Sequence, residues 1–273
     1  MNMLFKTMVT GCLGLVLLGC EMAQADQVVP ATEPDALTQT VESEDRADSV
    51  TDLLGRIEAQ TSQVKTLHAR LRYTTIQGLL GDEQVRFGEL WYAAPDAFAE
   101  EAEVPAFERL AVHIQREKRD EPVVPANQWL VFDGRFFLER DEADRRAVRR
   151  ELLPADEPQA AALPLPIRLD REETQMRFDV IQRDDDARPE DAPAGITLDF
   201  TPKPGFEAEP MVITFDADSL LPLEVRFGEL DGDLTIFRLI DLEANSEKVD
   251  RDLFDTRLPE APGWDNQFVP FGE

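Results

Sequence analysis

The sequence has few of the residues that most often carry chemistry in proteins. Its 273 residues include two cysteines and two histidines. Both cysteines, Cys12 and Cys20, lie near the N-terminus, so a mature domain after them has no thiol pair for a disulfide. His68 and His113 show no metal-ligand spacing, and the sequence contains no G-x-S-x-G motif and no glycine-rich phosphate loop. We therefore expect a protein that is not an enzyme and that has no metal and no cofactor.

Basic residues are also scarce. The chain has 28 Lys and Arg against 56 Asp and Glu, which gives a formal net charge of -28. This charge repels nucleic acid and anionic membrane surfaces, so neither is expected as a direct partner. Arginines gather in one stretch, where they either offset neighbouring acidic residues or meet lipid phosphates or an acidic partner: Arg140, Arg145, Arg146, Arg149 and Arg150.

The first twenty residues have the layout of an export signal. Lys6 precedes an apolar run that ends in Leu17-Leu18-Gly19-Cys20 and is too short for a permanent membrane helix. This ending looks like a lipobox, which predicts a lipoprotein signal peptide over 1–19, lipidation of Cys20 and anchoring to a membrane. Ala23-Gln24-Ala25 is a rival cleavage site, and cleavage there would release a soluble periplasmic protein.

Residues 20–50 are polar and acidic and have no apolar period, which is typical of a disordered tether. From Thr51 onward, Leu53, Leu54 and Ile57 recur at helical spacing, which predicts one helix ending near Val64. The folded domain is therefore expected over residues 51–273.

Most of this domain alternates apolar and polar residues, as β-strands do. A long hairpin is expected from Leu67 to Tyr92 with its turn near Gly81-Asp82, and a second hairpin turns at Asp133-Gly134. Further strands are expected at 110–115, 147–152, 177–182, 196–200, 211–215, 223–227 and 234–242. The pentapeptide Arg-Phe-Gly-Glu-Leu occurs at 86–90 and at 226–230, in surroundings so different that we interpret the repeat as coincidence.

One antiparallel meander with an apolar face and a polar face fits these strands better than two domains. Its apolar face needs a cover, and the candidates are the N-terminal helix and the proline-broken segment 152–170. If these segments fill the concavity, the result is a plain core. If they close it as a lid, the result is a cavity for a long apolar ligand. The sequence leaves both interpretations open.

Several segments, taken in order, resemble the LolA/LolB lipoprotein-carrier family. Two further segments of the chain, 101–125 and 184–193, are insertions relative to the family pattern. The resemblance is carried by Asp52-Leu53-Leu54-x-Arg56-Ile57, Gly88-x-Leu90-Trp91-x-x-x-Pro95-x-x-Phe98, Leu130-Val131-x-Asp133-Gly134, Leu198-x-Phe200-Thr201-Pro202-Lys203, Ile213-x-Phe215-Asp216, and Phe254 with Pro259-x-x-Pro262-Gly263.

The resemblance implies a mainly β fold, with one strongly curved antiparallel sheet, an unclosed half-barrel, and a few helices over its concave face. It also implies a protein that binds acyl chains for lipoprotein localisation at the periplasmic side of the outer membrane, with possible envelope protein partners. The lipobox favours a form anchored to that membrane over a soluble shuttle. The alternative is a structural envelope lipoprotein whose sheet is filled by its own side chains. Ala94 stands where the LolA pattern has an arginine that latches the lid. The expected ligand-binding residues are Leu71, Tyr73, Trp91, Phe98, Trp129, Val131, Phe137, Phe200 and Phe215.

Overall fold

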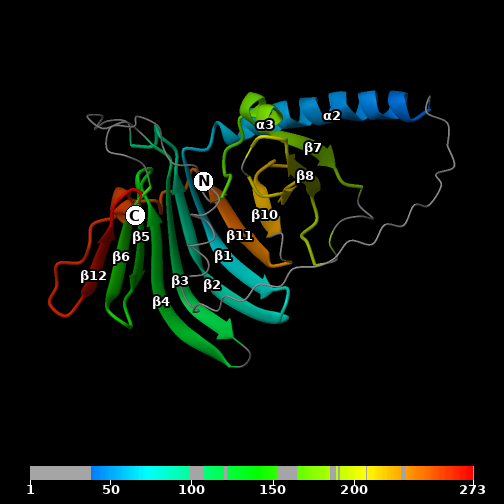
Figure 1. Cartoon of the computed structure of the whole chain (residues 1–273). Coiled ribbons are helices and arrows are strands. Elements are labelled where there is room, and N and C mark those ends of the chain that lie inside the picture. The colour runs from blue at the N-terminus through cyan, green and yellow to red at the C-terminus, as the bar shows by residue number, and fades with distance from the viewer. Residues whose placement is uncertain are drawn as a thin grey trace.

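One curved sheet of twelve strands dominates the part of the chain that the structure describes (Figure 1). The computed structural model describes residues 38–98, 107–119, 122–152, 165–184, 189, 191–206, 208–228 and 232–272. The strands are β1 Thr66–Gln77, β2 Asp82–Ala93, β3 Arg109–Arg119, β4 Val123–Phe132, β5 Phe136–Asp141, β6 Arg146–Glu151, β7 Phe178–Gln182, β8 Ile196–Pro202, β9 Met211–Phe215, β10 Pro222–Gly228, β11 Leu234–Ala244 and β12 Asp265–Val269.

The spatial order of the strands is β12-β6-β5-β4-β3-β2-β1-β11-β10-β9-β8-β7. Strand β1 pairs with β11, so the two halves of the chain meet in the middle of the sheet. All pairs are antiparallel except β12, which runs parallel to β6. Because β12 and β7 lie at opposite ends of this order, the sheet is not closed. The expected mainly β half-barrel with few helices is confirmed.

The two predicted hairpins are present. Gly81 lies in the β1–β2 turn and Gly134 lies in the β4–β5 turn, with positive φ angles of 70° and 98° that favour glycine. In the first hairpin Tyr73 pairs with Arg86, and this register decides which side chains share a face. Strands β3 and β4 also extend farther than predicted, into the segment expected to be an insertion.

Helix α2, Thr38–Thr61, begins earlier than the predicted start at Thr51. Residues 38–50 are therefore helical where the composition predicted a tether. No glycine or proline occurs from Thr38 to Leu54, so nothing interrupts the helix once its packed end has formed. The remainder of the predicted tether and the predicted signal peptide lie outside the described residues.

The main hydrophobic core lies on the concave face, where α2 and the segment 165–169 pack against the sheet (Figure 1). The helix contributes residues at helical spacing, among them Leu53, Leu54 and Ile57, which are all buried. Burying a side chain of this kind stabilises the fold by about 1.5–3 kcal/mol. The segment 165–169 contributes Leu165, Ile167 and Leu169. It is the described end of the predicted cover 152–170, and residues 153–164 lie outside the described residues.

Polar contacts hold this cover in place. The amide of Leu169 donates to Thr61 Oγ1 at 3.4 Å, and Arg168 donates to the carbonyl of Ser62 at 3.2 Å. Helix α3, Arg171–Arg177, follows at once, and the amide of Arg171 donates to Glu58 Oε1 of α2 at 3.2 Å. The cover is therefore tied to the end of α2 as well as to the core.

A smaller hydrophobic cluster lies on the convex face, beneath the chain that leads to the C-terminus. The 3₁₀ helix η3, Arg251–Phe254, and the residues around it cover Trp91, Ala111 and Val131. Neither η3 nor β12 was predicted. None of the helices in the described residues is both long and apolar enough to cross a membrane.

Candidate ligand pocket in the concave face

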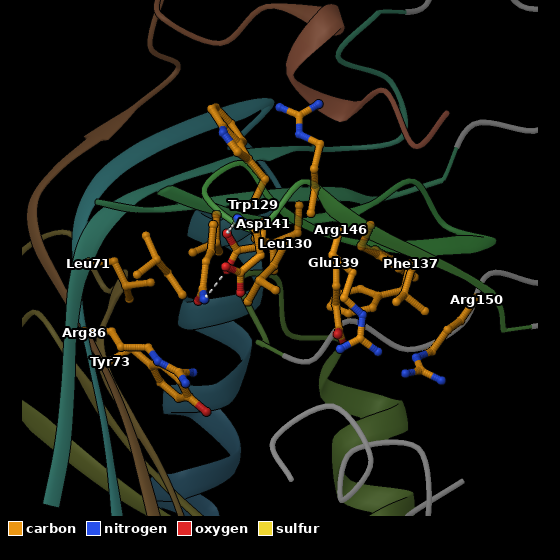
Figure 2. A pocket seen from close by; sticks show the side chains of 18 of the residues that line it. Leu71, Tyr73, Arg86, Trp129, Leu130, Phe137, Glu139, Asp141, Arg146 and Arg150 are labelled. Carbon is orange, nitrogen blue, oxygen red and sulfur yellow. Dashed lines mark hydrogen bonds between the residues drawn. The ribbon is translucent and has the colours of Figure 1, made fainter. Parts of the chain in front are cut away.

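The core does not fill the whole concave face. A pocket of about 240 Å³ remains over strands β1 to β6 (Figure 2). Because alternate residues of a strand share a face, each strand presents every second side chain to this pocket. The apolar part of its lining consists of Leu71, Tyr73, Leu110, Val112, Ile114, Leu130, Phe132, Phe137, Val148 and Phe237.

Tyr73 and Arg86 form one side of the pocket (Figure 2). The guanidinium carbon of Arg86 lies 5.6 Å from the centre of the Tyr73 ring, within reach of a cation–π interaction. Arg86 also donates to Glu117 Oε2 at 3.4 Å and to Gln84 Oε1 at 3.2 Å. Tyr73 in turn stacks on Phe237, with ring centres 4.7 Å apart. The guanidinium group of Arg86 is therefore already engaged by other side chains of the protein.

Glu139, Arg146 and Arg150 lie on the other side of the pocket (Figure 2). Glu139 pairs with Val148 across β5 and β6, so Arg146 and Arg150 are its diagonal neighbours on the same face. Burial raises the pKa of the Glu139 carboxyl, and the charges of Arg150, Arg146 and Arg86 counteract this only in part.

A hydrogen bond between an amide and a carboxylate also borders the pocket. Gln128 Nε2 donates to Asp141 Oδ2 at 2.9 Å, and Asp141 Oδ1 accepts from the amides of Ala143 and Asp144 at 2.9 and 3.0 Å. Asp141 is thus engaged in holding the β5–β6 turn. Within the described residues, no group of three or more His, Cys, Asp and Glu side chains is placed to hold a metal ion.

The structure places five of the nine expected ligand-binding residues on the concave side. Leu71, Tyr73 and Phe137 line the pocket. Phe200 and Phe215 are buried in the main core, on the half of the sheet that α2 covers, and they do not line the pocket. These two residues are part of the protein's own filling of the concavity.

The other four expected residues belong to the convex cluster. Trp91 and Val131 are buried there, and Phe98 and Trp129 pack against them. In Figure 2 the ring of Trp129 points away from the other labelled side chains, although this residue also borders the pocket. This placement corrects the prediction for Trp91, Phe98 and Val131, whereas Trp129 borders the pocket as predicted. Trp91 pairs with His68 and Leu71 pairs with Gly88, so Trp91 and Leu71 lie on opposite faces.

Ala94, the position expected to lack a latch, is buried in the main core at 2% exposure. Its amide donates to the carbonyl of Lys65 at 2.8 Å, just beyond the end of α2. The position is therefore close to the cover, and its side chain lies among the apolar residues of the main core.

Sequence reasoning missed the polar side of the pocket. Arg146 and Arg150 were noted only as part of an arginine-rich stretch, and Arg86 and Glu139 were not singled out. The alternation Arg146-x-Val148-x-Arg150 was the available signal, because it puts both arginines on one face of a strand.

No protein-family model matches the chain, and no significant match was found among curated protein sequences. Structural similarity was found to MucB, with a TM-score of 0.41 and 16% identity, over 77% of this chain and 64% of that one. A DUF1329 family protein from Desulfovibrio piger aligns with a TM-score of 0.40 and 14% identity, over 77% of this chain and 97% of that one. A LolA superfamily protein from Nitrosomonas europaea aligns with a TM-score of 0.31 and 10% identity, over 74% and 97%.

LolA superfamily structures are thus among the structural neighbours of this chain, as the resemblance predicted. The chain spans less than two thirds of the length of MucB. All three TM-scores lie below 0.5 and all three identities lie below 20%. Function is therefore argued below from the residues of this chain.

Proposed function

We propose that this protein is an exported, lipid-anchored, non-catalytic lipid-binding protein of the cell envelope, which holds an acyl chain in the concave pocket. The observation that carries the proposal is the apolar lining of Leu71, Val112, Leu130, Phe137 and their neighbours, which belong to the main core and border a pocket of about 240 Å³ in the half-barrel. A concave and mostly apolar pocket is the usual form of a small-molecule site.

The size of the pocket limits what it holds. Ligand pockets typically measure about 300–1,000 Å³, so a pocket of about 240 Å³ suits part of one acyl chain. Burying about eight methylene groups would contribute roughly 6 kcal/mol before the costs of association, at about 0.8 kcal/mol each. That contribution suits reversible holding of a chain rather than permanent storage.

The anchor is the part of the proposal that rests on sequence. Lipidation of Cys20 would tether the folded domain to the periplasmic face of a membrane, which we propose to be the outer membrane. Cleavage after Ala25 would instead give a soluble periplasmic form. In both forms the pocket would receive acyl chains of lipoproteins or of other lipids.

A second candidate is a structural or interaction lipoprotein without a ligand. It is favoured by the extent to which α2 and the segment 165–169 fill the concavity. It is also favoured by the exposed edge strand β12, which pairs only with β6 and carries the exposed Phe268. Such an edge can accept a strand from a partner.

Native mass spectrometry of protein purified from its host separates the two candidates. A lipid that copurifies with the wild type and is absent from Leu130→Trp supports the first, because Leu130 lines the pocket and a larger ring would occupy it. The matched control is Leu80→Trp at the exposed tip of the β1–β2 hairpin, which should keep the lipid. A protein that is always empty, and that also fails to bind added dodecanoate, would favour the second candidate.

A further inference from the structure

Strand β6 contributes two positively charged side chains to the wall of the pocket, whereas the protein as a whole is strongly negative. Arg146 and Arg150 both line the pocket, on either side of Val148, and the acid between them is Glu139 of β5. The two guanidinium groups share this face with Glu139 and with Asp141, the cross-strand partner of Arg146, in a chain whose acidic residues outnumber its basic ones two to one. Arg146 and Arg150 are thus a local concentration of positive charge in a protein that as a whole repels anions.

The hydrogen bonding of this wall is incomplete. Among the described residues, neither Arg146 nor Arg150 forms an ion pair within 4.0 Å, in contrast to Arg86 with Glu117. Glu139 Oε1 and Arg150 Nε are buried and have no hydrogen-bond partner in the described part of the chain. Buried polar atoms nearly always have partners, so the unpartnered Nε of Arg150, a donor beside an apolar pocket, points to a ligand that accepts hydrogen bonds.

The apolar lining begins directly beside these donors. Phe137 and Leu130 adjoin Glu139 on the same face, and Val148 separates the two arginines. A ligand whose head accepts hydrogen bonds from the guanidinium groups would therefore place its tail in the apolar part of the pocket. A free anion would use only the first half of this site, and a neutral lipid would use only the second.

We propose that the pocket takes a single-chain amphiphile with an anionic head, a carboxylate or a phosphate, which Arg146 and Arg150 bind while the chain lies along Leu130 and Phe137. This inference rests on the proposed function and specifies its ligand class. Guanidinium groups suit such heads because they present paired donors to two oxygens. Glu139 is the internal competitor, since its carboxylate faces the same arginines.

The test is isothermal titration calorimetry of the purified protein below the micelle concentration. The probes share one tail length: dodecanoate, dodecyl phosphate and the neutral dodecyl maltoside. We expect both anions to bind at least about tenfold more tightly than the maltoside, because a hydrogen bond to a charged group is commonly worth a factor of this size. The ratio between dodecanoate and dodecyl phosphate then distinguishes the two head types.

Three variants complete the test. Arg146→Gln/Arg150→Gln should reduce anion binding to the level of the maltoside, and Glu139→Gln should strengthen anion binding without changing maltoside binding. The control is Arg149→Gln on the same strand, because Arg149 stacks over Phe136 on the opposite face, and it should bind like the wild type. Thermal unfolding confirms that each variant is folded.

The outcomes separate the two proposals. Equal binding of anionic and neutral probes, or an undiminished anion affinity in the double arginine variant, would overturn the head-group inference while leaving lipid binding intact. Inorganic phosphate binding as tightly as dodecyl phosphate would overturn it as well, since the tail would then contribute nothing. Failure of all three amphiphiles to bind would instead overturn the proposed function.

Discussion

Trp91 and Trp129 stack on the convex face of the sheet, with ring centres 5.8 Å apart and 14° between the ring planes. Trp129 also stacks on His113 at 4.2 Å. The third tryptophan of the chain, Trp264, packs against the same cluster. Trp91 and Trp264 therefore lie away from the concave pocket, and Trp129 belongs to the convex cluster but borders the pocket.

We therefore expect the native tryptophan emission to change little when dodecanoate binds, because Trp129 is the one indole that borders the pocket and its ring stacks within the convex cluster. A tryptophan in place of Phe237, which lines the pocket beside Tyr73, should report binding by a shift to shorter wavelength. The control is Phe268→Trp on the exposed strand β12, which should not respond. A shift in the wild type together with a silent Phe237→Trp would place the ligand on the convex face instead.

The two copies of the Arg-Phe-Gly-Glu-Leu pentapeptide have different surroundings, and their glycines should respond differently to substitution. A Cβ on Gly88 would lie 2.0 Å from the carbonyl oxygen of His113, a backbone atom that cannot move aside. Gly228 has nothing within 4 Å of its Cβ position. We expect Gly88→Ala to destabilise the protein by about 3 kcal/mol or more and Gly228→Ala by about 0.5 kcal/mol or less. Urea unfolding measures both, and equal effects would contradict the described packing.

Local patterns predicted most of the sheet, because hairpin turns and the alternation of apolar and polar residues can be recognised from residues that are adjacent in sequence. Asp133-Gly134 and Gly81-Asp82 fixed two turns without knowledge of the fold. Strand β12 could not be found this way, since its sequence is polar and its partner β6 is distant and parallel. The early start of α2 could not be predicted from local patterns either. Its first residues have no apolar period, and they are helical because they continue a helix whose other end packs on the core.

The faces of the strands were harder to assign than the strands. Strands β2, β3 and β4 bury side chains on both faces, so an apolar residue such as Trp91 does not reveal its side. Counting through the first hairpin would have shown it, because Trp91 pairs with His68, which lies an odd number of residues before Leu71 and so on the opposite face. The cover over this face, which includes η3, could not be foreseen from local patterns.

Ala94 tests whether a latch can be introduced into this chain. Because Ala94 is buried in the main core, Ala94→Arg would bring a guanidinium among apolar side chains. We expect a loss of about 3 kcal/mol of stability rather than tighter closure of the cover. The control is Ala59→Arg on the exposed side of α2, which should be nearly neutral. A stable Ala94→Arg that releases dodecanoate more slowly would show that the position does latch the cover.

The proposed anchor makes a prediction that separates the two cysteines. Cells given radiolabelled fatty acid should label the wild type and Cys12→Ser, and labelling should disappear in Cys20→Ser. Amino-terminal sequencing gives the complementary result. A mature protein that begins at Asp26 would show that cleavage follows Ala25 and that the protein is not anchored through Cys20.

Glu139 gives the pocket a dependence on pH. Its pKa is raised above the ordinary value of 4.5, mainly by burial, so the folded protein holds this proton more tightly than the unfolded chain does. The stabilising contribution of the protonated carboxyl is complete below pH 4.5 and is lost as the pH rises through the raised pKa. Glu139→Gln keeps an uncharged side chain at every pH.

The stability of Glu139→Gln relative to wild type should therefore increase from pH 4 to pH 8, as measured by urea unfolding. Glu243 is the control, because the hydrogen bond from Lys248 lowers the pKa of its carboxyl. Its ionised form is favoured in the folded state, so Glu243→Gln should lose stability relative to wild type as the pH rises from below 4.5. Parallel pH profiles for wild type and Glu139→Gln would mean that Glu139 reaches solvent freely, and the polar wall of the pocket would then not be desolvated.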